Sequence, residues 1–178
     1  MILTDAKILQ QIESKDIVIQ PFDRSCLGCN SYDVHLGKTL GLYKNETLDS
    51  KSHNEIETFE IPEEGIVLTP DKFYLGVTHE YTESHKHVPF LEGKSSVGRL
   101  GIDIHATAGK GDIGFCNHWT LEISVKQPVR VYYNMPIGQL IFFEVDGDIL
   151  TPYNKKASAK YVQKKDIPME SMMFKNSF

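Results

Sequence analysis

The chain has 178 residues, 40% of them hydrophobic and 24% charged, and its formal net charge is -5. This length and composition suffice for one domain with its own apolar core, and they exclude general disorder. Binding to DNA or RNA is not expected, because it depends on neutralising many phosphates, whereas a small phosphorylated ligand needs only a few local cations.

The sequence also disfavours export and membrane association. The three cysteines, Cys26, Cys29 and Cys116, are an odd and sparse set that indicates free thiols in a reducing cytoplasm. After Met1 the chain lacks a basic and then apolar leader, and no apolar run approaches the roughly 20 residues of a membrane span. We therefore expect a cytoplasmic protein without a membrane partner.

Residues 4 to about 15 are predicted to form one amphipathic helix. Thr4 is a suitable N-cap, and Ile8, Leu9 and Ile12 recur at helical spacing on one face. We expect this helix to pack beside a sheet.

After the helix the hydrophobic period changes to two, and short β-rich runs alternate with Pro and Gly. Many short strands with few helices predict an all-β fold, a distorted barrel or jelly roll, in a single domain over residues 1–178. An alternation of strands and helices is absent, so a Rossmann-type fold is not expected. The expected strands are Ile17–Gln20, Tyr32–Leu36, Ile56–Ile61, Gly65–Thr69, Phe73–Thr78, Ile102–Ala106, Trp119–Val125, Val129–Tyr133 and Ile137–Val145.

Two segments carry few core residues. Residues 44–55 are polar and predict an exposed loop. The tail from Pro152 onward contains five lysines before a short apolar end at Met172, Met173 and Phe174. Composition favours a solvated, partly ordered terminus, and the alternative is a basic arm that closes over an anionic ligand.

Polar groups are densest between residues 92 and 125, and the first run of this region covers residues 92–101. This run supplies two serines, Lys94, Arg99 and three glycines, which together can donate many hydrogen bonds to a phosphate. The spacing is not that of a Walker loop, and a surface turn of small residues is an equal alternative.

Glu122 is the strongest candidate for a general base. The odd positions of Trp119–Val125 are apolar, so Glu122 shares the opposite face with Thr120 and Ser124. If that face lines a cleft, the carboxylate can move protons; if it faces solvent, it is an ordinary strand residue. Asp112 lies just before this strand in a Gly-rich turn.

The metal-binding patterns are incomplete. Zinc deaminases carry His-x-Glu followed by Pro-Cys-x-x-Cys, whereas here Cys26 and Cys29 precede His53-Asn54-Glu55 and lack the Pro. We therefore expect no zinc. His85-Lys86-His87 with Glu92 resembles the first metal motif of cupins, and it leaves a metal-binding barrel as an alternative.

Several segments together resemble dCTP deaminases, relatives of the trimeric dUTPases. They cover nearly the whole chain in the family's order. They are Ile2-Leu3-Thr4-Asp5, Ser31-Tyr32-Asp33-Val34-His35-Leu36-Gly37, Gly93-Lys94-Ser95-Ser96-Val97-Gly98-Arg99-Leu100-Gly101, His105-Ala106-Thr107-Ala108-Gly109, Asp112-Ile113-Gly114-Phe115, Trp119-Thr120-Leu121-Glu122 and Met135-Pro136-Ile137-Gly138-Gln139-Leu140.

The resemblance implies a dUTPase-like barrel with a short N-terminal helix, a closing arm over residues 152–178, and a homotrimer with active sites between subunits. By the same resemblance Glu122 is the general base and acid that deaminates dCTP to dUTP without zinc. Ser95 and Arg99 position the attacking water. The residues implied to bind the substrate and its Mg²⁺-bearing triphosphate are Lys94, Ser96, Ala108, Asp112, Tyr153, Lys160 and Gln163.

Two departures from the family pattern leave alternatives open. The arm pattern Lys-Tyr-x-x-Gln is shifted in this chain. Either Gln163 or Lys164 can therefore take the ligand-contacting role of the pattern's final Gln. Gly111 replaces an apolar residue before Asp112. Some relatives also cleave dUTP to dUMP and pyrophosphate with the matching aspartate, so a bifunctional enzyme is the first alternative. A diphosphatase without deamination is the second.

Overall fold

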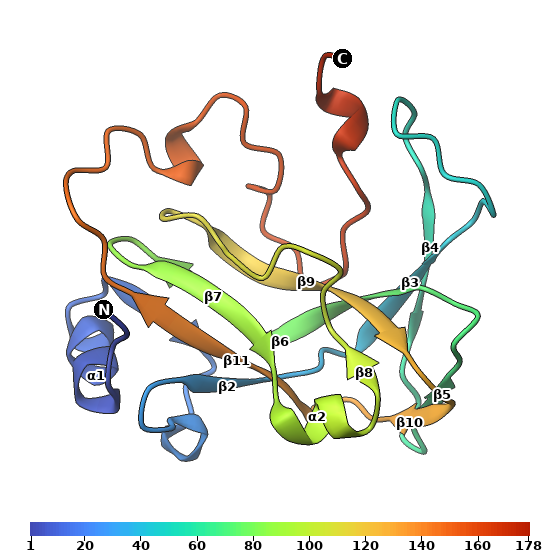
Figure 1. The fold of residues 1–178 in the computed structure, drawn as a ribbon, viewed down its shortest axis with the longest axis horizontal. Helices are drawn as coiled ribbons and strands as arrows, with labels where there is room; N and C mark the ends of the chain where they lie inside the picture. The colour runs from blue at the N-terminus through green and yellow to red at the C-terminus, as the bar shows by residue number, and fades with distance from the viewer.

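The strands form three antiparallel sheets around one apolar core in the computed structural model, which describes residues 1–178 (Figure 1). The largest sheet has the order β4 (Ile56–Glu60), β3 (Thr39–Tyr43), β6 (Tyr74–Ser84), β9 (Cys116–Val125) and β8 (Ile102–Asp103), and β1 (Ile17–Gln20) also pairs with β6. A second sheet contains β2 (Tyr32–His35), β11 (Pro136–Phe143) and β7 (Val88–Gly93). A third pairs β10 (Val129–Val131) with β5 (Ile66–Leu68).

The core follows from the alternation of the strands. In β9 the odd positions are buried, and Leu121 and Ile123 have no exposed surface. Leu140 of β11 is also fully buried and belongs to the same apolar cluster. Burying a side chain of this size contributes about 1.5–3 kcal/mol, so this pattern fixes which face of β9 is turned outward.

Short helices complete the fold. Helix α1 (Asp5–Glu13) begins at Thr4, whose side chain accepts a hydrogen bond from the amide of Lys7, and it buries Ile8. Helix α2 (Ser95–Arg99) follows β7 at the bottom of the view in Figure 1. Three 3-10 turns are η1 (Arg24–Cys26), η2 (Tyr153–Lys155) and η3 (Met173–Lys175). None of the helices has both the length and the apolar composition needed to cross a membrane.

The all-β prediction is confirmed, and the three sheets do not close into one continuous barrel. All nine predicted strands are present, although only Ile102–Asp103 of the run Ile102–Ala106 is a strand. Strands β3 and β7 were not predicted, because Gly41 interrupts the first and Pro89 the second. The predicted helix over residues 4–15 ends at Glu13.

Strand β6 runs on to Ser84, well past the predicted end at Thr78. Its second half buries polar side chains, among them Glu80 and Thr82, so the hydrophobic pattern stops while the strand continues. Glu80 is satisfied there by the backbone amide and ring of His35, at 2.8 and 2.6 Å. Buried polar residues with partners cannot be distinguished from loop residues by hydropathy alone.

The polar segment 44–55 is exposed as predicted, except at Asn54, which is buried and holds the loop together through bonds to Asp49 and Ser52. Residues 152–178 follow β11, turn back and lie across the top of the view in Figure 1. This arm packs on the rest of the chain, which favours the closing arm over a solvated terminus.

Candidate active site

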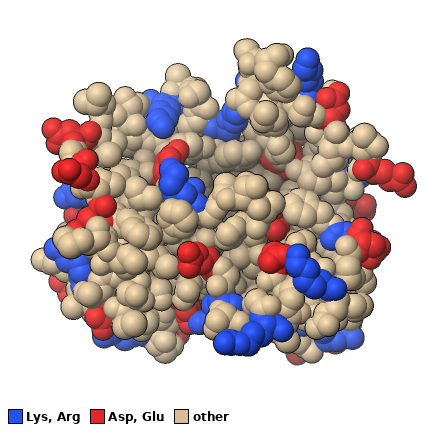
Figure 2. Space-filling model, in the orientation of Figure 1, with Lys and Arg blue, Asp and Glu red and all other residues tan.

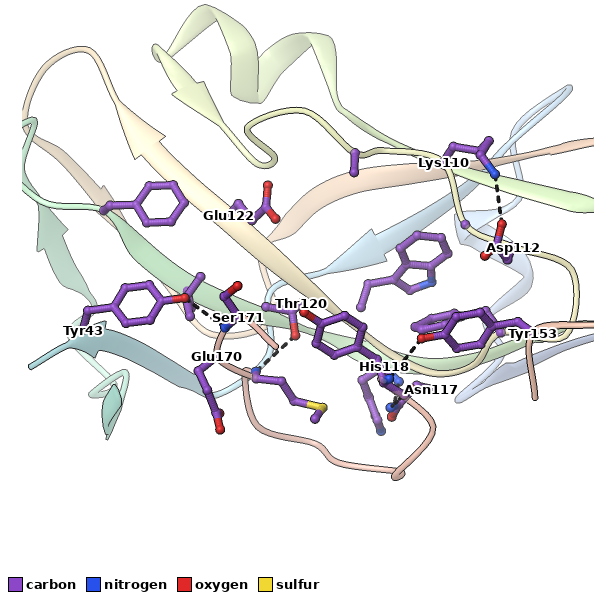
Figure 3. A pocket seen from close by; sticks show the side chains of 18 residues that line it. Tyr43, Lys110, Asp112, Asn117, His118, Thr120, Glu122, Tyr153, Glu170 and Ser171 are labelled. Atoms are coloured by element: carbon purple, nitrogen blue, oxygen red, sulfur yellow. Dashed lines mark hydrogen bonds and ion pairs between the residues drawn. The ribbon is translucent and has the colours of Figure 1, made fainter. Parts of the chain in front are cut away.

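A cavity of about 480 Å³ lies between the outward face of β9 and the arm, and the space-filling view is hollowed at the corresponding place below the arm (Figure 2). Half of the side chains around it are apolar and half polar (Figure 3). This size suits a small organic ligand such as a nucleotide base and sugar. The lining residues are Tyr43, Phe73, Leu75, Ala108, Lys110, Gly111, Asp112, Phe115, Asn117, His118, Trp119, Thr120, Glu122, Tyr153, Tyr161, Met169, Glu170 and Ser171.

Glu122 is half-buried on the outward face of β9, and its carboxylate points into the cavity (Figure 3). Because its neighbours Leu121 and Ile123 are held in the core, the strand period alone forces this direction. The backbone amide of Ala106 donates a hydrogen bond of 2.8 Å to Oε2 of Glu122. This bond fixes the carboxylate and leaves the other oxygen free to accept a proton.

Asp112 is one of three carboxylates that line the cavity, with Glu122 and Glu170. It lies in the turn before β9, where Lys110 contacts it at 3.0 Å. Gly111 beside it packs against the ring of Trp119, and a Cβ at Gly111 would lie 2.5 Å from that ring and 2.9 Å from Pro89. The departure from the family pattern at this position is therefore required by packing, since any side chain would push Trp119 out of place.

Aromatic side chains form one wall of the cavity. Phe115 lies 5.0 Å from Trp119 and 6.0 Å from Tyr153, measured between ring centroids. The indole N–H of Trp119 donates to Thr82, which holds the ring in position. Such a wall offers flat apolar surface to a planar ligand.

The arm closes the cavity through bonds between side chains of the body and the backbone of the arm. Asn117 donates to the carbonyls of Tyr161 and Gln163, at 3.3 and 2.8 Å, and accepts from the amide of Lys165 at 3.0 Å. Further along, the amide of Met169 donates to Thr120 at 3.2 Å. The amide of Ser171 likewise donates to the hydroxyl of Tyr43 at 3.0 Å.

Tyr161 adds a polar group to this closure. Burial raises the pKa of its hydroxyl, so the group stays protonated and can donate as well as accept. It already accepts a hydrogen bond from the amide of Met172 at 3.0 Å, while Tyr153 accepts from the amides of Lys160 and Tyr161.

The structure brings four of the predicted site residues to this cavity: Glu122, Asp112, Ala108 and Tyr153. The other six do not line it. Ser95, Ser96 and Arg99 are exposed on α2. Lys94 forms an ion pair with Asp33 of β2.

Lys160 and Gln163 lie in the arm outside the cavity. The ammonium group of Lys160 donates a hydrogen bond to the side-chain oxygen of Asn176. Gln163 contributes its backbone carbonyl to Asn117, and its side chain is exposed. The alternative residue Lys164 lies 3.6 Å from the ring centre of Tyr81, also outside the cavity.

A model of the dCTP deaminase-like family matches residues 2–145. The chain belongs to this family. It is 48% identical to the "dCTP deaminase, dUMP-forming" of Clostridium botulinum (strain Eklund 17B / Type B), over 99% of this chain and 98% of that protein. Proteins of the same name from Clostridium acetobutylicum and Cytophaga hutchinsonii are 47% and 46% identical over the same shares.

A solved structure supports the fold. The crystal structure of 2'-deoxycytidine 5'-triphosphate deaminase from Agrobacterium tumefaciens aligns with a TM-score of 0.63 at 20% identity, over 79% of this chain and 47% of that chain. The dUTPase-like all-β architecture expected from the sequence is thus found in the dCTP deaminase-like family.

The cupin alternative loses its support. His85 and His87 do not gather with Glu92, because the only group of three metal-ligating side chains is Glu83, His85 and Cys116. His87 is buried, and its Nδ1 has no hydrogen-bond partner. In the zinc-like motif, His53 pairs instead with Glu170 of the arm at 2.9 Å.

Sequence reasoning missed several lining residues of this deaminase-like chain. His118 could have been found, since it shares the even positions of β9 with Thr120 and Glu122. Tyr43 and the arm residues Met169 to Ser171 could not, because contacts between distant segments place them. The bond from Ser171 to Tyr43 spans 128 positions of the chain.

Proposed function

We propose that the protein converts dCTP to dUMP, ammonia and pyrophosphate, with two molecules of water consumed. The observation that carries the proposal is that the carboxylates of Glu122 and Asp112 line the same cavity in a chain from the dCTP deaminase-like family. The sequence favoured a deaminase that stops at dUTP. The dUMP-forming name of relatives at 46–48% identity supports the bifunctional alternative instead.

Glu122 performs the deamination in this proposal. Its carboxylate takes a proton from a water whose oxygen attacks C4 of the cytosine, and a tetrahedral intermediate forms. The same carboxyl group then gives the proton to the amino group, and the C4–N4 bond breaks to release ammonia. The bond from the Ala106 amide supports this role, because it holds one carboxylate oxygen in place while the other handles the proton.

Asp112 performs the second hydrolysis. It orients and activates a water that cleaves the α–β phosphoanhydride bond of the bound dUTP, giving dUMP and pyrophosphate. Lys110, at 3.0 Å from Asp112, orients the carboxylate and adds a cation near the phosphates. The backbone around Ala108, in the same cavity, provides hydrogen bonds to the edge of the base.

The active site is completed by a second copy of the chain. Ser95 and Arg99 are exposed and lie outside the cavity of their own chain, which supports their action in the cavity of a neighbour within a homotrimer. Lys94 and Ser96 reach the triphosphate from the same segment, and Lys94 exchanges Asp33 for a phosphate. Tyr153, Lys160 and Gln163 belong to the arm that closes over the ligand.

The substrate is dCTP with Mg²⁺ bound to its phosphates. Magnesium binds the phosphate oxygens and reduces the charge that the cations of the protein must balance. Deamination itself needs no zinc in this mechanism, because Glu122 supplies the proton transfers. A cytoplasmic location, where dCTP is found, agrees with the composition.

The test is a chromatographic time course of dCTP with Mg²⁺, run with and without a zinc chelator. We expect dUMP, ammonia and pyrophosphate in equal amounts, unchanged by the chelator. Accumulation of dUTP without dUMP would contradict the second hydrolysis and leave a deaminase alone. Intact dCTP would contradict the whole proposal.

A further inference from the structure

Three side chains with metal-ligating atoms gather at the end of β6 and β9 that is remote from Glu122. They are Glu83, His85 and Cys116, and their ligand atoms all lie within 4.8 Å of one another. We infer that these three residues bind one transition-metal ion of the zinc class, at a site separate from the active cavity.

The sheet and its turn bring the three residues together. Glu83 and Cys116 are directly opposite in the antiparallel pair of β6 and β9, so both side chains point to the same face. His85 follows two residues after Glu83, and its Nε2 lies 2.7 Å from Oε2 of Glu83. Two backbone hydrogen bonds hold this turn against β9. The amide of Ser84 donates to the carbonyl of Phe115 at 3.3 Å, and the amide of Gly114 donates to the carbonyl of Ser84 at 2.7 Å.

The donor set suits zinc. One thiolate, one imidazole and one carboxylate match the ligands that Zn²⁺ takes at about 2.0–2.3 Å, with a water in the fourth tetrahedral position. Such ligands are roughly 3.3–3.8 Å apart, so a small rotation of side chains is enough to close the present cluster. The thiol of Cys116 now contacts only the carbonyl of Gly114, at 3.4 Å, and on binding it gives its proton to the solvent.

A supporting contact orients the carboxylate. The hydroxyl of Tyr81 donates to Oε1 of Glu83 at 2.7 Å, which leaves Oε2 for the metal. Partners of this kind hold metal-ligating side chains in place in many sites, and their loss weakens binding by about 10- to 100-fold.

The site is too far from Glu122 to take part in deamination. Cys116 and Glu122 are separated by six positions of β9, which is about 20 Å at the rise of a strand. A metal ion here therefore has a structural effect: it ties the turn after β6 to the start of β9. Deamination by Glu122 proceeds with or without it.

Cobalt(II) provides the test, because it replaces zinc and its bond to a thiolate absorbs in the near ultraviolet. We expect the metal-free full chain to bind one Co²⁺ with this band and with the visible bands of a tetrahedral site. Cys116→Ser should abolish the near-ultraviolet band. Cys29→Ser, an exposed cysteine outside the cluster, should leave it unchanged.

Two further variants keep the test decisive if Cys116→Ser does not fold. His85 is exposed, so His85→Ala leaves the core intact and should lower the affinity for Co²⁺ at least tenfold. Tyr81→Phe removes only the supporting hydroxyl and should lower it about tenfold. The inference is overturned if the folded parent shows no thiolate band at saturating Co²⁺, if the band depends on Cys29, or if His85→Ala binds as tightly as the parent.

Discussion

The carboxylate of Glu122 accepts a hydrogen bond of 2.8 Å from the backbone amide of Ala106. A backbone donor is fixed by the course of the chain, so the carboxylate keeps its direction into the cavity without help from a flexible side chain. The bond also joins β9 to the segment that carries Ala108, which lines the same cavity. The proposed proton-transfer group and the proposed base-binding backbone are thereby held at a constant separation.

Replacing Glu122 with Gln should abolish deamination. The amide keeps the shape of the side chain but cannot take a proton from water, and losing a general base costs about 10²- to 10⁴-fold in rate. Ammonia release measures the loss, and calorimetric titration with dCTP should show that binding is retained. Ser124→Ala, on the same strand face but outside the cavity, is the matched control. Turnover near the parent rate would contradict the role of Glu122.

Replacing Asp112 with Asn should separate the two hydrolyses. Deamination continues through Glu122, whereas cleavage of the phosphoanhydride bond falls by about 10²-fold or more because its base is lost. Chromatography should then show dUTP accumulating in place of dUMP. The control is Asp71→Asn, an exposed aspartate outside the cavity, which should give dUMP at the parent rate. If Asp112→Asn still forms dUMP directly, another group performs the second step.

Mixing two inactive variants should restore activity if neighbouring chains share each site. Arg99→Ala lacks the group supplied to a neighbour, and Glu122→Gln lacks the base of its own cavity. In mixed trimers formed from equal amounts, about a quarter of the sites combine an intact Glu122 with an intact Arg99. Turnover of dCTP after joint refolding measures the recovery. No recovery, in trimers shown to contain both chains, would place both residues in the same subunit.

Replacing Asn117 with Ala should loosen the arm. Three hydrogen bonds to the arm backbone are lost, each worth about 0.5–1.5 kcal/mol, so the open arm becomes more populated. The KM for dCTP should rise several-fold, and limited proteolysis should cut residues 152–178 faster. Deleting the arm from Pro152 onward should raise KM further. The control is Asn30→Ala, which changes an exposed asparagine elsewhere. It should alter neither the KM for dCTP nor the rate at which the arm is cut.

Acid should destabilise the fold through His87. Burial lowers the pKa of this histidine below 6.5, with Asp16 and Glu144 opposing the shift and Lys7 and Lys86 adding to it. Below pH 6.5 the unfolded chain therefore binds more protons than the folded one, and the free energy of unfolding falls as pH falls, by at most about 1.4 kcal/mol per pH unit. The contribution of the neutral His87 to the free energy of unfolding is fully present above pH 6.5.

Urea unfolding at pH 7.5 and at pH 5.5 measures this effect. His87→Gln should reduce the difference in the free energy of unfolding between the two pH values. His79 makes only a 3.4 Å contact with Tyr133, so His79→Gln should leave this difference unchanged. An equal pH dependence in the parent and in His87→Gln would contradict the assignment to His87.

The outward direction of Glu122 could be predicted because β9 alternates strictly, and a period of two leaves one solution once Leu121 and Ile123 are buried. Helix α2 could not be predicted. It has five residues, includes Gly98 and two serines, and carries no side-chain cap, so its helical form depends on the buried Val97 rather than on local propensity. The placement of Ser95 and Arg99 on this helix was missed for the same reason.

The arm shows a similar limit. Its lysines suggested contact with an anion, but Lys160 and Lys164 lie outside the cavity, and Tyr161, Met169 and Ser171 line it instead. These residues are placed by Asn117, Thr120 and Tyr43, which are far away in the sequence. Local composition favoured a solvated terminus, and the family resemblance implied that the arm closes. Neither indicated which of its side chains face the cavity.

Nearly all bonds from the body to the arm end on backbone atoms of the arm, at Tyr161, Gln163, Lys165, Met169 and Ser171. A backbone carbonyl or amide is present whichever residue occupies the position, with proline as the exception for the amides. Mutations can thus exchange the side chains of the arm while its docking persists. The shifted Gln163 is one such exchange, and the arm is the part of this enzyme in which a new ligand preference can evolve at the least cost to the fold.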